Sequence, residues 1–545
     1  MLRISPRLAV AACVGVLAAG LAPLGAAGLT PLGAAGPTQL GANAAPDKGA
    51  SGDRNLGKHD RELLVEAQAS GDRNVTLIVA AASGSSAKVQ GAVEALGGTV
   101  RYREDDLGYL RVVVPLNKAK NVAALTGVLA VDVDETVVID DPLPEPGGQV
   151  APTPQTPPGA NTPAVNPYMP TGDIGSPQFV SEHPTWDGRG TTIGIIDSGV
   201  DFGHPALQTT STGERKIVDW VTATDPTFTN GRNNDNDPTW LDMSTQVSGP
   251  TFTQDGTTYT APAAGTFRFA VFNERDARLG GEVGNDVNRD RNPAGSSGLF
   301  GVLWDTTTNN VYVDTDQDKS FADQTGMTDY KVSQQVGRFG TDNPATEVTE
   351  SMPFVVQTDG KNKVVNIGIV SGAHGSHVAG ITAANSMFGG EMDGAAPGAK
   401  LVSVRVCMFV TGCTAHALIE GMIYAAKQSN VDVINMSIGG LPALNDGNNA
   451  RAVLYDKLIE TYSVQMFISA GNSGAGINTI GDPSVASKVM SVGSYITNDT
   501  WASNYGSSTT QTDNLHPFSS RGPREDGRFK PQIVAPGSAI STVPT

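Results

Sequence analysis

Three side chains of the kinds used in acid–base and oxyanion chemistry lie far apart in the sequence. Asp197 ends the apolar run Ile193–Ile196, His374 stands among small residues, and Asn472 follows the apolar run Met466–Ala470. A histidine can take a proton from a nucleophile when a carboxylate orients its other ring nitrogen. A side-chain amide can donate a hydrogen bond to a developing oxyanion. These residue types suit acyl transfer if the fold brings them together.

Each of these side chains also has a plainer interpretation. Asp197 could simply begin a turn, and Asn472 could be an ordinary turn residue. His374 and His377, spaced i and i+3, could face a metal ion. Zinc is the weaker interpretation because no general-base Glu lies between the two histidines and no third ligand is apparent. We interpret His377, one turn further along, as a structural histidine.

The residues around these side chains predict the elements that position them. The run Ile193–Ile196 is short and rich in isoleucine, as in a buried parallel strand, and Ser198-Gly199 turns the chain sharply after it. The residues after Gly375 are small and helix-compatible, which places His374 at or near the first turn of a helix.

Two more strands are predicted at 431–440 and 466–474, each ending in a Gly-rich turn, with a helix over 450–462 between them. Strand–helix–strand units build parallel sheets, and α/β sheets bind ligands at the carboxyl ends of their strands. Asp197 and Asn472 are both expected at that edge. The fold class predicted for this region is therefore α/β.

Four motifs in this region resemble, in the same order, the aspartate, histidine, substrate-strand and oxyanion motifs of the subtilisin-like serine peptidases, or subtilases. They are Ile195-Ile-Asp197-Ser-Gly199, His374-Gly-Ser-His-Val-Ala-Gly380, Asn435-Met-Ser-Ile-Gly-Gly440 and Ala470-Gly-Asn472. The match is extended by Phe518-Ser-Ser-Arg-Gly522 and Lys530-Pro-Gln-Ile-Val-Ala-Pro-Gly537. The resemblance covers roughly residues 173–545 and implies a subtilisin-like, doubly wound parallel sheet.

The resemblance also implies a role for each motif. Asp197 would be the orienting carboxylate, His374 the general base and acid, and Asn472 an oxyanion donor. An extended peptide substrate would bind as an added strand, and the substrate-binding residues would be Ser437, Ile438, Gly439 and Gly440. Ser376 replaces the Thr that is commoner in the family, which is a mild change.

The nucleophile is the main departure from the family pattern. In the family, the Ala-Pro-Gly turn that ends here at Gly537 is followed by a Gly-Thr-Ser-Met-Ala segment that holds the catalytic serine. No such segment occurs before Thr545, and neither Ser538 nor Ser541 has the turn and helix that would present a hydroxyl to His374. We expect the serine to follow Thr545. The alternative is an inactive fragment or a pseudo-peptidase that binds peptides.

The N-terminal residues resemble an export signal. Arg3 and Arg7 precede the uncharged run Leu8–Gly20, and Ala42-Asn-Ala44 is a small-x-small cleavage site. We expect residues 1–44 to be a signal peptide of a secreted, extracellular protein that has no membrane association after signal removal. A membrane anchor is the alternative, although the apolar run is short for a span.

Residues 45–73 are predicted to be a polar spacer, and residues 74–140 a compact β-α-β-β-α-β unit, which indicates a small α+β ferredoxin-like domain. The family resemblance implies that this domain is a propeptide that blocks the cleft of a zymogen. The Pro- and Gly-rich residues 141–172 are predicted to be an exposed linker that is cut during processing. The catalytic domain is expected to cover 173–545.

Composition restricts the partners. The chain has 37 Lys and Arg against 55 Asp and Glu, a formal net charge of −18, so a nucleic-acid partner is not expected. The expected partners are a protein or peptide substrate and the protein's own propeptide. Cys407 and Cys413 would meet an oxidising compartment after export, and a disulfide and a buried free pair are equally compatible with their spacing.

The long segment 201–372 between the Asp and His motifs is predicted to be an insertion with its own structure. Relatives resembling tripeptidyl peptidase II also have long insertions here, although length alone does not carry over that exopeptidase activity. Within it Asp314, Asp316 and Asp318 alternate as in calcium loops, while Lys319 stands where an EF-hand loop has Gly. A structural calcium site and a solvated acidic turn both remain open. No cofactor is expected for the chemistry.

Overall fold

The computed structural model describes residues 55–138, 171–229, 232–279, 298–341, 351–390, 392–410, 412–440, 445–505 and 510–539. The predicted signal peptide lies outside these residues, and so does the predicted linker except for its last two residues. The helices are α1 (Lys58–Ser70), α2 (Ser86–Ala95), α3 (Ala119–Ala123), α4 (Ser176–Glu182), α5 (Tyr330–Ser333), α6 (His374–Ala383), α7 (Ala415–Ile423), α8 (Ala450–Tyr462) and α9 (Asn498–Tyr505).

The main sheet carries the four family motifs. Its strands are β6 (Thr192–Asp197), β7 (Ile217–Thr222), β20 (Lys400–Arg405), β22 (Val433–Met436), β23 (Gln465–Ser469), β24 (Met490–Thr497), β25 (Asp513–Leu515) and β26 (Ile533–Pro536). The order is β25-β24-β23-β22-β6-β20-β7, with β26 also paired to β24. All pairs are parallel except β24 with β25. This is the predicted α/β sheet.

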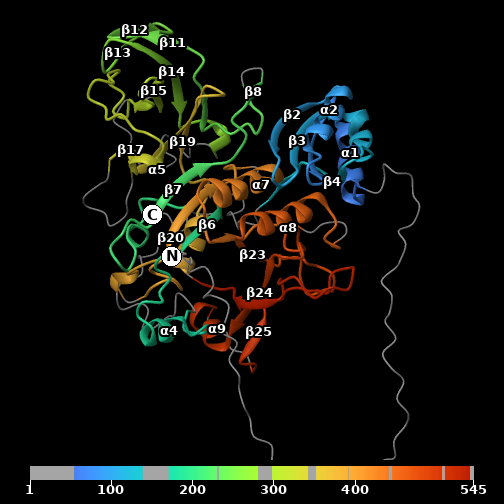
Figure 1. The fold of residues 1–545 in the computed structure, drawn as a ribbon. Helices are drawn as coiled ribbons and strands as arrows, with labels where there is room; N and C mark the ends of the chain where they lie inside the picture. The colour runs from blue at the N-terminus through green and yellow to red at the C-terminus, as the bar shows by residue number, and fades with distance from the viewer. Residues whose placement is uncertain are drawn as a thin grey trace, which may run out of the picture. The chain divides into compact units, whose positions relative to one another are not determined.

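Helices cover both faces of this sheet (Figure 1). Neighbouring residues of a strand point to opposite faces, and β6 shows this directly. Ile196 belongs to the apolar cluster that contains α7 and α8, whereas Ile195 belongs to the cluster that contains α6. The chain is therefore doubly wound, as the sequence predicts, and each face of β6 is buried under a different set of helices.

The N-terminal domain has the predicted ferredoxin-like topology. Its strands are β1 (Asn74–Ala81), β2 (Thr99–Glu104), β3 (Tyr109–Pro115) and β4 (Val128–Val133), in the antiparallel order β2-β3-β1-β4. One feature corrects the sequence prediction: α1 falls within the predicted spacer 45–73. Leu56 and Leu64 pack into the core of the domain, and α1 ends at Gly71, whose φ of 80° caps the helix.

The open face of this antiparallel sheet packs on α7 and α8 (Figure 1). Ile78 and Tyr109 of the N-terminal domain share one apolar cluster with residues of both helices. Two acidic side chains extend the contact. Asp132 accepts hydrogen bonds from the backbone N–H groups of Ala450 and Arg451 at the start of α8, and Asp134 accepts one from the second residue of α7. Both helix N-termini are thus capped by the N-terminal domain.

The predicted insertion 201–372 contains two further sheets. β7 lies within that range but belongs to the main sheet. One antiparallel sheet, in the order β10-β19-β18-β17, comprises β10 (Trp240–Asp242), β17 (Gly337–Phe339), β18 (Met352–Asp359) and β19 (Val364–Gly368). The other, in the order β11-β14-β15-β16, comprises β11 (Gln246–Ser248), β14 (Thr266–Asn273), β15 (Leu299–Asp305) and β16 (Asn310–Val313). Two small hairpins pair β8 (Phe228–Thr229) with β9 (Arg232–Asn233) and β12 (Thr251–Gln254) with β13 (Thr257–Thr260). The insertion has its own structure.

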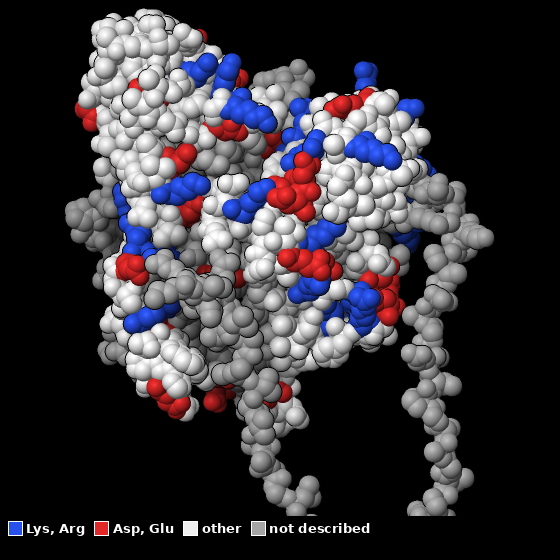
Figure 2. Space-filling view, viewed as in Figure 1, with Lys and Arg blue, Asp and Glu red and all other residues white. Residues whose placement is uncertain are grey.

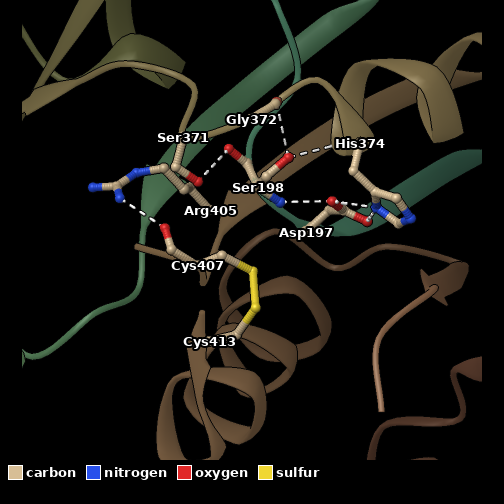
Figure 3. The surroundings of a disulfide bond; sticks show 9 residues. Asp197, Ser198, Ser371, Gly372, His374, Arg405, Cys407 and Cys413 are labelled. Atoms are coloured by element: carbon tan, nitrogen blue, oxygen red, sulfur yellow. Dashed lines mark hydrogen bonds and ion pairs between the residues drawn. A yellow bond between two sulfur atoms is a disulfide. The ribbon is translucent and has the colours of Figure 1, made fainter. Parts of the chain in front are cut away.

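Cys407 and Cys413 form a disulfide, which decides between the two possibilities left open by the sequence (Figure 3). The bond closes a short hairpin whose last residues form β21 (Cys413–Thr414). β21 pairs antiparallel with β5 (Thr136–Val137), the last strand of the N-terminal domain. The disulfide hairpin therefore pairs with the last strand of that domain.

The surface view shows Lys and Arg interspersed with Asp and Glu on the visible face, without a broad cationic patch (Figure 2). This distribution agrees with the acidic composition of the chain. Among the described helices, none combines the length and the apolar character needed to cross a bilayer.

Candidate active site

Asp197 ends β6 at the carboxyl edge of the main sheet, as predicted, and its side chain is completely buried. The N–H of Ser198 donates to Asp197 Oδ1 at 2.7 Å. The chain then turns at Gly199, whose φ of 95° suits glycine. The carboxylate is thus held rigidly by its own turn.

His374 is the first residue of α6, also as predicted. Its Nδ1 lies 2.9 Å from both carboxylate oxygens of Asp197, 177 residues away in sequence. Figure 3 shows the other ring nitrogen pointing away from the carboxylate. The side chain is 36% exposed. If Nδ1–H donates to Asp197, Nε2 is left with a lone pair that can accept a proton.

A serine that sequence reasoning did not single out joins the turn after Asp197 to the start of α6. Ser198 Oγ accepts the N–H of Gly375 at 2.9 Å and donates to the carbonyl of Gly372 at 3.0 Å (Figure 3). A Cβ on Gly375 would lie 2.4 Å from the carbonyl oxygen of Gly199, so only glycine allows this approach. The start of α6 is therefore packed directly against the Asp197 turn.

Ser376 replaces the Thr that is commoner in the family. Its side chain is buried and makes a hydrogen bond. Its Oγ accepts the backbone N–H of Asp201 at 2.9 Å. A hydroxyl at this position ties α6 to the chain that follows β6, and Ser supplies the hydroxyl as Thr would. This contact supports the prediction that the replacement is mild.

Asn472 lies in an exposed turn that follows β23. Because β6, β22 and β23 are adjacent and parallel, this turn lies at the same sheet edge as Asp197. Ser520 supports the turn from a distant motif: its N–H donates to the Gly471 carbonyl, and its Oγ accepts the N–H of Ser473. The Phe518–Gly522 motif thus positions the loop that carries Asn472.

The predicted substrate strand follows β22 at the same edge. Ser437 Oγ accepts a hydrogen bond from Asn435 Nδ2 at 3.2 Å, and Ile438 is buried. Gly440 differs from its predicted substrate-binding role, because its N–H and carbonyl are already paired with the backbone of Asp482 at 3.0 and 2.6 Å. Gly440 therefore anchors the strand, and Ser437 to Gly439 remain the candidates for binding substrate.

His377 has a different environment from His374. Its Nε2 lies 2.9 Å from the carbonyl oxygen of Ala539, to which Nε2–H can donate, and burial lowers its pKa. This contact agrees with a structural role and leaves the two histidines pointing to different partners, contrary to a shared zinc site. It also places Ala539, two residues past the Ala-Pro-Gly turn, beside α6.

The acidic loop of the insertion gathers its three carboxylates. One oxygen from each of Asp314, Asp316 and Asp318 lies within 4.8 Å of the others. Asp314 is buried at the end of β16, where burial raises its pKa to about 6 even though Lys319 acts in the opposite direction. A hard divalent cation with oxygen ligands, such as Ca²⁺, fits this donor set.

Arg405 is a buried charge beside the site that sequence reasoning missed. It is the ladder partner of Asp197 in β20 and is fully buried. Its Nη2 lies 2.8 Å from Asp237 of the insertion, and its Nη1 donates to the Cys407 carbonyl (Figure 3). An arginine at the end of a strand that carries Leu401, Val402 and Val404 was the available sequence signal, since buried charges need a partner.

Two family models match the chain. The model described as "Subtilase family" matches residues 188–545, and the one described as "Putative peptidase inhibitor domain" matches residues 55–134. The second match begins close to the start of α1 and supports the assignment of that helix to the N-terminal domain.

Several known proteins are similar to this chain. Pyrolysin of Pyrococcus furiosus is 28% identical over 89% of the chain and 38% of its own length. Tripeptidyl-peptidase 2 of Caenorhabditis elegans is 27% identical over 67% of the chain and 30% of its own length. The crystal structure of Tripeptidyl Peptidase 2 aligns with a TM-score of 0.48 and 20% identity over 66% of the chain and 32% of that structure.

The chain thus spans 30% to 38% of the length of these two curated relatives. The subtilase match includes all four motifs and covers more than half of the chain. The chain belongs to the subtilase family of serine peptidases.

Proposed function

We propose that the protein is a secreted precursor of a serine peptidase that hydrolyses peptide bonds through an acyl-enzyme. The observation that carries this proposal is the 2.9 Å contact between His374 Nδ1 and the buried carboxylate of Asp197. That arrangement prepares Nε2 to accept a proton from a hydroxyl. The order of motifs in the family predicts that this hydroxyl belongs to a serine that follows Thr545.

In the proposed reaction, Nε2 of His374 takes the serine proton as the serine oxygen attacks the peptide carbonyl carbon. Asn472 donates to the resulting oxyanion. His374 then gives the proton to the leaving amine as the C–N bond breaks, which leaves the acyl-enzyme. A water molecule, deprotonated by His374, then attacks the acyl carbon, and the serine leaves and takes the proton back. Asp197 keeps the imidazole oriented and stabilises its protonated form.

The N-terminal domain is proposed to inhibit this site until the linker is cut. It packs on α7 and α8, and its last strand, β5, pairs with the disulfide hairpin. Family membership and the match to an inhibitor domain support the same role.

Hydrolysis of casein tests the proposed activity. The protein produced with the sequence that follows Thr545 should degrade casein, and a serine-directed fluorophosphonate should abolish the activity. A folded, secreted protein that binds casein peptides without cleaving them would instead identify a pseudo-peptidase.

Processing should fall in the linker, between about Asp141 and Asp173, because the Pro- and Gly-rich composition of this segment favours exposure. N-terminal sequencing of the mature secreted protein checks this. A mature N-terminus before Val75 would show that the domain is kept.

Replacing Asn472 by Ala should lower kcat about 10²- to 10³-fold with little change in KM, because an oxyanion donor acts mainly in the transition state. Steady-state kinetics on a peptide anilide measures both constants. Asn448→Ala, in another exposed turn, is the matched control and should stay within about twofold of the native rate. Equal losses in the two variants would rule out an oxyanion role.

We also propose that Asp314, Asp316 and Asp318 hold structural calcium, on the strength of their converging oxygens. Since an ion that binds only the folded state stabilises it, EDTA should lower the melting temperature and added Ca²⁺ should restore it. The double variant Asp316→Asn, Asp318→Asn should melt at the same temperature with and without EDTA. A native melt that EDTA leaves unchanged would favour the solvated turn.

A further inference from the structure

Buried charges from three parts of the chain meet where the N-terminal domain, α7 and the insertion join. The first group, here called the Arg111 cluster, comprises Arg111 of β3, Asp225 just after β7, and Glu420 of α7. Their side chains are 5%, 1% and 10% exposed. Nothing in the proposed peptide-bond chemistry uses these residues.

Arg111 makes a forked contact across the junction. Its Nη1 donates to Asp225 Oδ2 at 2.5 Å, and its Nη2 donates to Glu420 Oε2 at 3.3 Å. Nε lies 2.8 Å from Glu420 Oε1, which also accepts the hydroxyl of Tyr109 at 2.9 Å. Burial alone would lower the pKa of Arg111, but Glu420 and Asp225 raise it, so the guanidinium is held in its charged form.

The insertion builds its side of this pocket with its own backbone and side chains. Asp225 Oδ1 accepts the N–H of Thr227 at 2.8 Å, and Oδ2 accepts Asn234 Nδ2 at 2.9 Å. The N–H of Asp225 donates to Asp235 Oδ2 at 2.7 Å. Despite burial, Arg111 and these donors lower the pKa of Asp225 to about 2. Groups within the insertion therefore fix the carboxylate in position, and Arg111 contributes most to keeping it ionised.

A neighbouring contact joins the same three parts. His416 of α7 is buried, with Nδ1 2.6 Å from Asp134 of the N-terminal domain and Nε2 3.2 Å from Asp235 of the insertion. Charge pairs thus join all three parts at two points. The rest of the contact between the N-terminal domain and the catalytic unit combines the apolar cluster around Ile78 and Tyr109 with ion pairs of Arg451 and Lys427, which do not involve the insertion.

Charge pairing at a buried junction discriminates between partners. Apolar contact accepts many side chains of suitable size, but a buried carboxylate pair without its cation carries a large desolvation cost. A domain without a guanidinium at position 111 would leave Asp225 and Glu420 buried without the cation that pairs with both. Lysine would keep the charge but lose the fork.

We propose that the insertion and α7 form a guanidinium-binding pocket that selects this protein's own inhibitor domain, with Arg111 as the residue that determines the specificity. The inhibitory role rests on the proposed function, but the selective binding does not. The ligand of this pocket is the arginine of a folded inhibitor domain, and the insertion takes part in recognising it.

Retention of the domain after linker cleavage tests the proposal. The full 545-residue chain is given a cleavage site for a sequence-specific peptidase between Pro154 and Gln155, cut, diluted and followed by gel filtration. The cut native protein should stay together. Arg111→Met should release the domain at least about 30-fold faster, and Arg111→Lys at an intermediate rate.

A mutant cycle shows whether charge pairing is the cause. The double variant Asp225→Asn, Glu420→Gln should also release the domain faster than the native protein. Adding Arg111→Met to this double variant should increase the release rate much less than it does in the native background, because no unpaired charge remains. Additive effects, or release by Arg111→Met within about threefold of native, would overturn the proposal. If Arg111→Met fails to fold, Arg111→Lys and the amide variant carry the test.

Asp106→Asn is the matched control, because Asp106 also pairs across the interface, with Lys427 at 3.2 Å, but is 58% exposed. It should release the domain within about threefold of the native rate. Casein hydrolysis by the longer protein is measured separately. Its absence would refute the peptidase but leave the retention result intact.

Discussion

Replacing His374 by Ala, in the protein extended by the sequence that follows Thr545, should lower kcat/KM for peptide hydrolysis by about 10⁵- to 10⁶-fold. Without the imidazole nothing takes the proton from the nucleophile. Asp197→Asn should lower kcat/KM about 10⁴-fold, because an amide in place of the carboxylate favours the wrong histidine tautomer. Steady-state kinetics on a peptide anilide measures both losses, with active-site titration to fix the enzyme concentration.

His183→Gln is the control for the first prediction. This exposed histidine follows α4 and stacks on Trp186, so its replacement should leave kcat/KM within about twofold. The double variant Asp197→Asn, His374→Ala should be no slower than His374→Ala alone, because the two residues act as a unit. Retention of more than about 1% of native activity by His374→Ala would contradict the assigned roles.

Replacing Arg405 by Met should lower the free energy of unfolding by about 3–5 kcal/mol, because it leaves Asp237 as an uncompensated charge. Both side chains are fully buried, and Arg405 pairs in register with Asp197. Asp237→Asn should also destabilise the protein. The double variant Arg405→Met, Asp237→Asn should recover part of the loss, since neither charge is left alone.

Urea unfolding followed by tryptophan fluorescence measures these changes. The exposed pair Lys400 and Glu214, with side chains 33% and 54% exposed, provides the comparison. Lys400→Met should change the free energy by about 1 kcal/mol or less. Equal effects of Arg405→Met and Lys400→Met would show that the buried pair does not link the insertion to the main sheet.

Local pattern predicted the elements that bear on the site. The strand at β6, the helix that begins at His374 and the helix Ala450–Tyr462 all appear where the local sequence predicts them. Each has a pattern of apolar or small residues that no tertiary contact overrides. The α1 helix was missed because Leu64 is its only fully buried apolar residue, with Leu63 partly buried beside it, so its sequence shows little apolar periodicity.

In the insertion, the local sequence pattern does not predict which strands pair. Its sheet β10-β19-β18-β17 pairs Trp240 with Asn366, and its link to the main sheet joins Arg405 to Asp237 across 168 residues. Strand propensity does not encode partners at such separations. The membership of β7 in the main sheet was missed for the same reason.

The site residues were predictable from residue types and motif order, but the hydrogen bonds that hold them in place were not. Asp197 and His374 meet as the motifs imply. The bridge through Ser198 and the support of the Asn472 turn by Ser520 depend on close backbone approaches between distant segments. The pairing of Gly440 with Asp482, which removes a predicted substrate contact, has the same origin.

Covalent labelling tests the central claim most directly. The longer protein is treated with a fluorophosphonate and the modified residue is identified by mass spectrometry. The account predicts one labelled serine, in a Gly-Thr-Ser segment that follows Thr545, with labelling lost in His374→Ala. Absence of a labelled serine, or labelling that His374→Ala leaves unchanged, would contradict it.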